Sequence, residues 1–168
     1  TLLAVFLFTQ LSSFAVNYDV KFVPVPYTNP MGKVFGGVAT FSRFTPTVSE
    51  RVQYPGKFPW PTRLFFLDRC YLTHRYPLSH GKELIVINTH NSAYDETGEI
   101  KGGEMNAIKA FVEAEYKKGN YVIAGGDWNQ CPPNFQHDKF IPKSGYDGFM
   151  PPSMSFDYTP ENWLWAYD

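Results

Sequence analysis

Short runs of alternating or continuous apolar residues, separated by segments rich in proline and glycine, make up most of the chain. From Tyr18 to Val25, apolar and polar residues alternate with the period of two that a strand with one solvated face requires. Similar patterns predict strands over residues 38–43, 47–54, 63–73 and 83–88, the last two joined as a hairpin around His80-Gly81-Lys82. The segment from Tyr54 to Pro61 holds three prolines and a glycine, which predicts an irregular surface loop.

A helical period replaces the strand period after the hairpin. Between Gly103 and Lys118 the apolar residues recur at intervals of three and four, and Gly119 supplies a C-terminal stop. The apolar run from Tyr121 to Ala124 then predicts a buried central strand that opens into a loop at Gly125-Gly126. A strand, a helix and a second strand in this order predict parallel strands whose carboxyl ends meet at one edge of a sheet.

Residues 1–15 are open to two interpretations. Leu2 to Phe8 is a continuous apolar run, and Ser13-Phe14-Ala15 resembles a small-x-small cleavage site, so the segment could be the remnant of a signal peptide. It has no basic leader, and a buried helix of the domain explains the same run. The first interpretation implies a secreted or periplasmic protein, whereas the second leaves the compartment open.

The composition is that of one folded domain rich in strands. The 168 residues suit a single domain, and 43% hydrophobic with 18% charged residues excludes a disordered chain. Aromatic residues reach 18% beside 14 prolines and 13 glycines, which favours strands and well-defined turns over long helices. The formal net charge is -1, so no overall positive field draws the protein to nucleic acid or anionic lipid, although a local basic groove remains open.

The two cysteines carry little structural information. Cys70 and Cys131 make neither a disulfide framework nor the C-x-x-C spacing of a zinc site. We predict two buried thiols, with a single bridge as the alternative.

Polar residues follow both strands of the strand-helix-strand unit. Asn88-Thr89-His90-Asn91 closes the strand that begins at Glu83, and Asp127-Trp128-Asn129-Gln130 closes the strand that begins at Tyr121. Ligands of open α/β sheets bind outside the carboxyl ends of the strands, so we expect His90 and Asp127 to lie close together at a site. A carboxylate can bind a hard cation or take a proton from water, and an imidazole can protonate a leaving group. The alternatives are a plain turn and a satisfied, partly buried histidine.

The same two motifs carry a family resemblance. Asn88-Thr89-His90, then a helix, then Gly125-Gly126-Asp127-Trp128-Asn129 resembles the N-T-H and G-D-x-N motifs of the endonuclease/exonuclease/phosphatase superfamily, in order and in spacing. The segment from Gly37 to Arg43 is similar to that family's glycine-led strand ending in Ser-Arg. The resemblance implies an α/β fold, a four-layered α/β sandwich of two packed β-sheets with helices outside.

The resemblance also implies roles for single residues. Asp127 would orient or activate the attacking water and contact the metal, and Asn129 would position the scissile phosphate. His90 would hydrogen-bond the phosphate or assist the leaving oxygen, so these three are the catalytic candidates. Asn88 and Arg43 are the substrate-binding candidates, Asn88 chiefly as a support of its strand end and Arg43 alternatively as a residue that packs or pairs.

The implied reaction is attack of water on phosphorus without a covalent intermediate. Mg²⁺, or Mn²⁺ in its place, would neutralise charge on the phosphoryl oxygens and the leaving group. An alkoxide leaving group at neutral pH needs an acid or a metal beside it, so a site without a cation would be a poor catalyst.

Two motifs of the family are not found in the chain. The early strand with an Asn and the metal-binding Glu should precede residue 1, and the terminal Ser-Asp-His should follow Asp168. We therefore expect residues 1–168 to be a single but incomplete domain that lacks its N-terminal strand and its C-terminal Asp-His segment. The activity of this chain alone is an open question.

The substrate class stays open within this resemblance. A nucleic acid would require a basic groove beside His90, and a phospholipid would require an exposed apolar loop such as Phe58-Pro59-Trp60, while a sugar phosphate is the third option. No stable protein partner is implied, and we expect a monomer. The alternative function is a non-catalytic interaction module that retains the fold, and a carbohydrate-binding protein is a remoter one.

Overall fold

The computed structural model describes residues 11–20, 34–60, 68–93, 95, 97–135 and 155–166. These residues form six strands, one long helix and two short 3₁₀ turns. In chain order the elements are β1 (Leu11–Val20), β2 (Val34–Ser42), β3 (Val48–Gln53), β4 (Cys70–Pro77), η2 (Ser79–Gly81), β5 (Glu83–His90), α2 (Glu99–Lys117), β6 (Tyr121–Asp127) and η3 (Phe156–Tyr158). None of the described helices is long and apolar enough to span a membrane.

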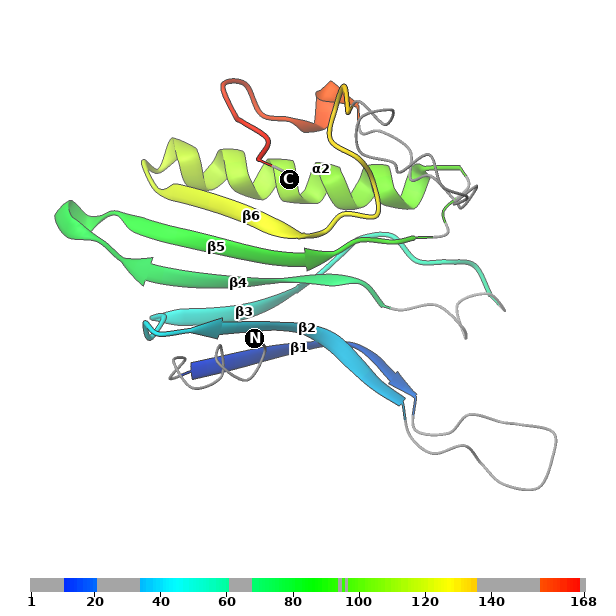
Figure 1. Cartoon of the computed structure of the whole chain (residues 1–168), viewed down its shortest axis with the longest axis horizontal. Helices are drawn as coiled ribbons and strands as arrows, with labels where there is room; N and C mark the ends of the chain where they lie inside the picture. The colour runs from blue at the N-terminus through cyan, green and yellow to red at the C-terminus, as the bar shows by residue number, and fades with distance from the viewer. Residues whose placement is uncertain are drawn as a thin grey trace, which may run out of the picture.

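The strands are arranged in two sheets. β1 and β2 pair antiparallel, and a second sheet has the strand order β3-β4-β5-β6. Within it β3, β4 and β5 are antiparallel, whereas β5 and β6 are parallel. Figure 1 shows α2 covering one face of the four-stranded sheet, with β1 and β2 lying against the other face. The described residues thus contain two packed sheets with a helix outside, an incomplete α/β sandwich of the expected class.

The core between α2 and the larger sheet follows from the strand alternation. Ile85 and Ile87 of β5 point to the same face and are 0% and 1% exposed, and they pack against Ile108 and Val112 of α2. Truncation of a buried isoleucine to alanine typically costs about 2–5 kcal/mol of stability. This core fixes the position of α2 over β5, and with it the spacing between the two strand ends that carry the polar motifs.

A smaller apolar cluster lies between the two sheets. Ala15, Val38, Cys70 and Leu72 pack together there, and all four side chains are buried. The buried His74 side chain also belongs to β4, and neither of its ring nitrogens has a hydrogen-bond partner. Burial lowers the pKa of His74, because the protonated imidazole would lose its hydration.

The helix begins four residues earlier than the sequence pattern predicts. α2 starts at Glu99, after Gly98 in the left-handed region with a φ of 74°. The Asp95 carboxylate accepts a hydrogen bond from the Lys101 backbone N–H at 2.9 Å, which satisfies one of the free donors of the first turn. The predicted end is confirmed within one residue, since α2 ends at Lys117, Lys118 is its C-cap and Gly119 follows with a φ of 82°.

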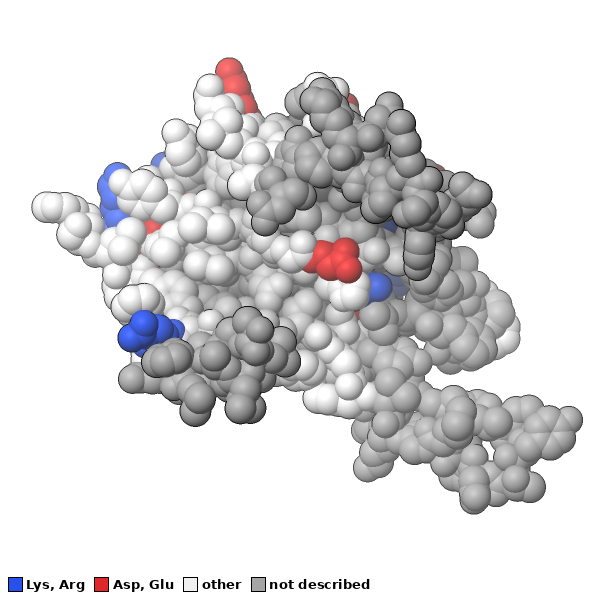
Figure 2. Space-filling view, viewed as in Figure 1, with Lys and Arg blue, Asp and Glu red and all other residues white. Residues whose placement is uncertain are grey.

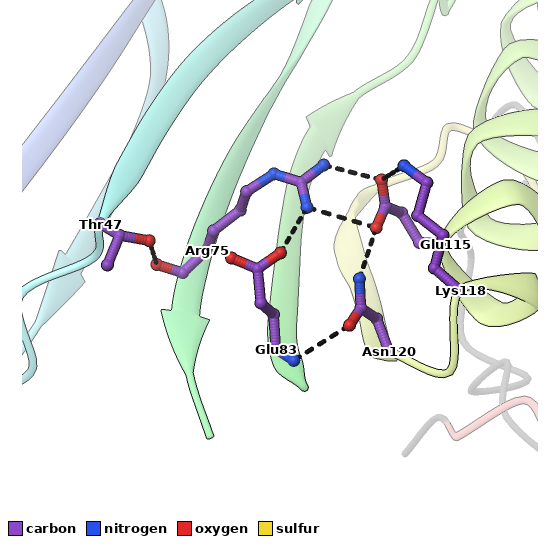
Figure 3. Close-up of polar contacts among 6 residues, drawn as sticks. All are labelled: Thr47, Arg75, Glu83, Glu115, Lys118 and Asn120. Carbon is purple, nitrogen blue, oxygen red and sulfur yellow. Dashed lines mark hydrogen bonds and ion pairs between the residues drawn. The ribbon is translucent and has the colours of Figure 1, made fainter. Parts of the chain in front are cut away.

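A closed network of charged groups joins the C-terminal end of α2 to the β4–β5 hairpin (Figure 3). The Arg75 guanidinium donates to both carboxylate oxygens of Glu115, at 2.7 and 3.2 Å, and to Glu83 at 2.8 Å. Lys118 and Asn120 also donate to the Glu115 carboxylate, at 2.8 and 2.7 Å. The Glu115 side chain is only 3% exposed, and the Arg75 hydrogen bond is the main reason why its pKa falls to about 2.

Several sequence expectations need correction. Residues 11–15 are not helical but form the first half of β1, where their alternation allows pairing with β2 from Leu11 to Val20. β6 lies at the edge of the described sheet and is not a buried central strand, as the 59% exposure of Ile123 shows. The hairpin prediction is confirmed, although its first strand runs to Pro77. Residues 1–10 and 61–67 lie outside the described residues.

Candidate functional site

His90 and Asp127 end two neighbouring parallel strands and face each other. They are register partners in the β5–β6 pairing, so both side chains leave the same face of the sheet. His90 Nε2 lies 3.7 Å from Asp127 Oδ2, and the two side chains are 36% and 62% exposed. The proximity predicted from the strand-helix-strand pattern is therefore confirmed, and the pair is open to solvent on one side.

Gly126 allows the two strands to come this close. A Cβ atom at this position would overlap the Thr89 carbonyl oxygen, and the φ of 141° is one that other residues rarely adopt. A glycine directly before Asp127 is thus a steric requirement of the strand pair. A Cβ atom on the preceding residue, Gly125, would meet nothing within 4 Å, so that glycine carries no such requirement.

Asn129 is tied to both strand ends. Its backbone N–H donates to Asp127 Oδ1 at 3.0 Å, and its side-chain Nδ2 donates to the Asn91 carbonyl at 2.8 Å. The Asn91 N–H in turn donates to the Asp127 carbonyl at 2.8 Å. Asn129 has a φ of 50°, a left-handed conformation that asparagine tolerates better than most residues. No other described residue bonds to the Asn129 side chain, which leaves one amide hydrogen and the Oδ1 atom for a ligand.

A buried hydrogen-bond network fixes the Asn91 side chain. The Tyr54 hydroxyl lies 2.5 Å from Thr89 Oγ1 and donates to Asn91 Oδ1 at 3.1 Å, and Thr89 Oγ1 donates to the same oxygen at 2.7 Å. Asn91 is fully buried, and its Nδ2 contacts the Met105 sulfur at 3.3 Å. Burial raises the pKa of Tyr54 far above its ordinary value, so its hydroxyl stays protonated and able to donate.

Sequence reasoning missed two residues at this end of the sheet, Arg69 and Glu104. The Arg69 guanidinium interacts electrostatically with Glu104 and Asp127, and it also acts on His90. Glu104 is only 1% exposed and lies in the first turns of α2. A charged residue at a buried position of the apolar helix face was the signal that could have revealed Glu104. Arg69 falls inside the predicted strand over residues 63–73, and the strand pattern alone gave no reason to single it out.

The electrostatics at this site favour the neutral form of His90. Burial lowers the pKa of His90 first, the Arg69 guanidinium lowers it further, and the Asp127 carboxylate partly opposes both effects. Figure 2 shows acidic and basic atoms side by side where β5 and β6 end in Figure 1. A neutral imidazole can donate a hydrogen bond from one ring nitrogen and accept a proton at the other.

The structure places the remaining candidates away from this pair. Asn88 Nδ2 donates to the Ala39 carbonyl at 2.8 Å and to Thr40 Oγ1 at 3.1 Å, so Asn88 links the two sheets just before the site. Arg43 is exposed directly after β2, whose arrowhead points away from the ends of β5 and β6 in Figure 1. Its near neighbour Thr47 bonds to the Arg75 carbonyl, which lies at the opposite end of the sheet.

The oxygen atoms at the site suit a hard divalent cation. Mg²⁺ binds carboxylate and amide oxygens, often through only one or two protein groups, and keeps several waters. Asp127 supplies an exposed carboxylate and Asn129 a free amide oxygen. Among the described residues no three or more His, Cys, Asp or Glu side chains gather in a way that could hold a metal ion. The described donor set therefore fits a hydrated cation with few protein ligands.

An open groove with aromatic walls runs along β6 to the site. It extends from Tyr121 to Asp127 and Asn129, and residues 158–166 form part of its wall. Trp165 contacts Trp128 edge to face, with ring centroids 5.7 Å apart, and Trp163 packs against the core beneath α2. The tryptophans near the end of the chain thus serve in packing. Cys70 and Cys131 are both free thiols, the first buried and the second partly exposed.

Comparison with known proteins places these features in a family context. A family model described as the endonuclease/exonuclease/phosphatase family matches residues 3–168. No curated protein matches the chain.

Solved structures also resemble the chain. Beta toxin from Staphylococcus aureus is 23% identical, with a TM-score of 0.45 over 62% of this chain and 37% of the toxin. An endonuclease/exonuclease/phosphatase from Beutenbergia cavernae is 20% identical, with a TM-score of 0.47 over 71% of this chain and 30% of that protein. The human Nocturnin catalytic domain, solved with a sulfate anion, is 14% identical, with a TM-score of 0.49 over 76% of this chain and 45% of that domain. The chain thus spans less than half the length of these structures.

Proposed function

The chain belongs to the endonuclease/exonuclease/phosphatase family, and we propose that it provides catalytic residues of a hydrolase that cleaves phosphate esters. One observation carries the proposal: a carboxylate, a neutral imidazole and a fixed amide converge at the carboxyl ends of β5 and β6. Such groups suit attack of water on phosphorus, because each can bind or move a proton at a defined point of the reaction.

Asp127 is the proposed group that orients and activates the water. Its carboxylate is 62% exposed, and Oδ1 is held by the Asn129 N–H, which leaves Oδ2 turned toward His90. A carboxylate fixed on one oxygen can accept a proton on the other when a water molecule lies between it and the phosphorus. No covalent intermediate is required in this scheme.

His90 and Asn129 are the proposed contacts to the phosphoryl group. The neutral imidazole can donate one hydrogen bond to a phosphoryl oxygen or to the leaving oxygen. Asn129 can donate its second amide hydrogen to the same group, because its first is already bound to Asn91. The Asn129 side chain is positioned by its bond to the Asn91 carbonyl before substrate binds, and such preorganisation stabilises developing charge at little reorganisation cost.

Mg²⁺, or Mn²⁺ in its place, is the proposed cofactor. Asp127 and the Oδ1 atom of Asn129 would hold it, and when bound it would neutralise charge on the phosphoryl oxygens and the leaving group. The alternative function, a non-catalytic interaction module with the same fold, does not require this ion. Metal binding therefore separates the two functions.

The test is hydrolysis of a panel of phosphate esters by the purified protein, with Mg²⁺ and with a chelator. The panel holds a generic phosphodiester, a phosphomonoester, a single-stranded nucleic acid and phospholipid vesicles. The vesicles are included because Trp60 is 79% exposed, a feature of a lipid-facing loop. We expect metal-dependent turnover of at least one member by the wild-type protein.

Two variants assign that turnover to the site. Asp127→Asn should lose it, whereas Glu50→Gln, which neutralises an exposed carboxylate on β3, should retain it. Absence of turnover on every member, together with no measurable binding of Mg²⁺ or Mn²⁺, would contradict the catalytic function and favour the interaction module.

A further inference from the structure

Arg69 lies immediately before β4, on a backbone that is fixed at both sides. Its carbonyl oxygen accepts hydrogen bonds from the Tyr54 N–H at 3.1 Å and from Gln53 Nε2 at 2.7 Å. β4 and β5 are antiparallel with Tyr71 opposite Thr89, so the residues before Tyr71 lie beside those after Thr89. Arg69 therefore enters the site from the side opposite to Asp127, next to the end of β5.

The Arg69 side chain is within electrostatic range of the proposed catalytic pair. It interacts electrostatically with Asp127, Glu104 and His90, and among the described residues no ion pair joins it to either carboxylate. The side chain is partly buried, and its Nη1 atom is buried without a hydrogen-bond partner. A guanidinium carries five donors in a rigid fork, and a buried donor without an acceptor is costly. An oxygen-rich anion seated against this partly exposed guanidinium would supply the acceptor that the described residues do not provide.

Glu104 explains how an unpaired cation is tolerated near the core. Its buried carboxylate attracts the Arg69 guanidinium electrostatically, and each of its oxygens already accepts one hydrogen bond from Ser92. Oε2 accepts the Ser92 N–H at 2.9 Å, and Oε1 accepts the Ser92 hydroxyl at 2.7 Å. Glu104 thus supplies compensating charge without occupying the donors of Arg69, and these donors stay available for a ligand.

We propose that Arg69 is a phosphate-binding residue of this site, which donates its guanidinium fork to two non-bridging oxygens of the substrate phosphoryl group. The proposal rests on the proposed function for the chemical class of the ligand. It adds a residue that no motif of the sequence marked and that the His90, Asp127 and Asn129 assignment does not include. A bidentate guanidinium contact of this kind fixes the orientation of the phosphoryl group as well as its charge.

Binding of inorganic phosphate to the intact protein tests the proposal, measured by isothermal titration calorimetry. Arg69→Gln should weaken phosphate binding at least tenfold, because both charge and fork are lost. Arg69→Lys should fall between Arg69→Gln and the wild type, because a lysine keeps the charge but not the fork. Lys57→Gln is the matched control, since Lys57 is an exposed cation of the loop after β3, and it should bind phosphate within twofold of the wild type.

Three outcomes would overturn the proposal. They are wild-type affinity in Arg69→Gln, an equal loss of affinity in Lys57→Gln, and no measurable phosphate binding by the wild-type protein. Thermal unfolding of each variant shows whether it is folded. If Arg69→Gln does not fold, the lysine variant decides, and wild-type phosphate affinity in that folded variant overturns the proposal.

The ester panel separates this inference from the proposed function. Turnover by the wild-type protein with an unchanged kcat/KM in folded Arg69→Gln would leave the hydrolase intact and remove Arg69 from the site. Arg69-dependent phosphate binding without turnover of any ester would support the residue assignment and contradict the hydrolase. If both hold, Arg69→Gln should raise KM more than it lowers kcat.

Discussion

The two ends of the β5–β6 strand pair differ in how their charges are satisfied. At the amino end, Arg75 and Glu115 form a bidentate pair, and Glu83, Lys118 and Asn120 complete a closed network. At the carboxyl end, the His90 imidazole lies 3.7 Å from the Asp127 carboxylate, and among the described residues Arg69 has a buried donor without a partner. One end is complete within the described residues, whereas the other is organised around groups that can still bind.

The contrast separates stability from function along one pair of strands. Removing one partner of a closed, buried ion-pair network is strongly destabilising, because the remaining charge is left unpaired in an apolar environment. Charged groups with unused hydrogen-bond donors or acceptors cost the protein stability, and they cluster where ligands bind. We therefore expect substitutions at the amino end to change the free energy of unfolding and substitutions at the carboxyl end to change activity.

The largest expected effect belongs to the carboxyl end. Asp127→Asn removes the proposed base and should lower kcat/KM for the preferred ester roughly 10³-fold, about 4 kcal/mol of transition-state stabilisation. Because this side chain is 62% exposed, urea unfolding should show little change in stability. A variant that loses stability and activity in parallel would break the proposed separation of the two ends.

The next effect belongs to the amino end. Glu115→Ala leaves Arg75 without its bidentate partner and should destabilise the fold by about 3 kcal/mol in urea unfolding, with phosphate affinity unchanged in the folded protein. Glu113→Gln is the control on the same helix. Its side chain is 39% exposed, and its ion pair with Lys109 is long, at 4.0 Å. The free energy of unfolding should therefore fall by less than about 0.5 kcal/mol.

The pH dependence of stability should report the same network. Glu115 has a folded-state pKa of about 2 against 4.5 for the unaffected group, so the unfolded chain binds more protons below its own pKa. The contribution of Glu115 is fully present above the unfolded pKa, and roughly 2 kcal/mol should be lost between about pH 5 and about pH 3. Urea unfolding of Glu115→Gln should lack this part of the pH dependence. An identical pH profile would contradict the role of the network.

The smallest effect tests how the carboxyl end is supported. Tyr54→Phe removes the hydroxyl that holds Thr89 and Asn91, and it should cost about 1 kcal/mol in stability. If the transition state loses a similar amount of stabilisation, kcat should decrease about fivefold. Tyr71→Phe is the control, because Tyr71 packs 5.3 Å from Tyr54 and its hydroxyl takes no part in this network. Equal loss of kcat in both variants would assign the effect to packing.

The sequence predicts the parts of this molecule that follow from local pattern. The apolar period places α2 and the parallel strands, and strand pairing then brings His90 and Asp127 together. The steric requirement for glycine at position 126 is visible only in the structure. In the sequence Gly125 looks the same, yet a Cβ atom there would meet nothing within 4 Å. Prediction from pattern thus succeeds where one strand or helix decides the outcome.

The remaining features depend on contacts between distant segments. Arg69 and Tyr54 reach the site from the two sides of the β3–β4 connection, and the strand patterns that cover both positions do not indicate what the two side chains contact. Arg43 is the last residue of a family-like segment but lies away from His90 and Asp127. β2 runs opposite to β5 (Figure 1), and the nearby Thr47 N–H donates to the Arg75 carbonyl at the other end of the sheet. Residues 11–15 are apolar enough for a helix, yet pairing with β2 makes them a strand. In each case tertiary contacts decide what local pattern leaves open.

Anomalous diffraction from crystals of the protein soaked with Mn²⁺ and inorganic phosphate would show directly whether the carboxyl end of the strand pair binds both ligands. We predict a Mn²⁺ peak within coordination distance of Asp127 and Asn129, with phosphate between that ion and His90. A peak confined to another part of the molecule, or no peak at the carboxyl ends of β5 and β6, would contradict the proposed site.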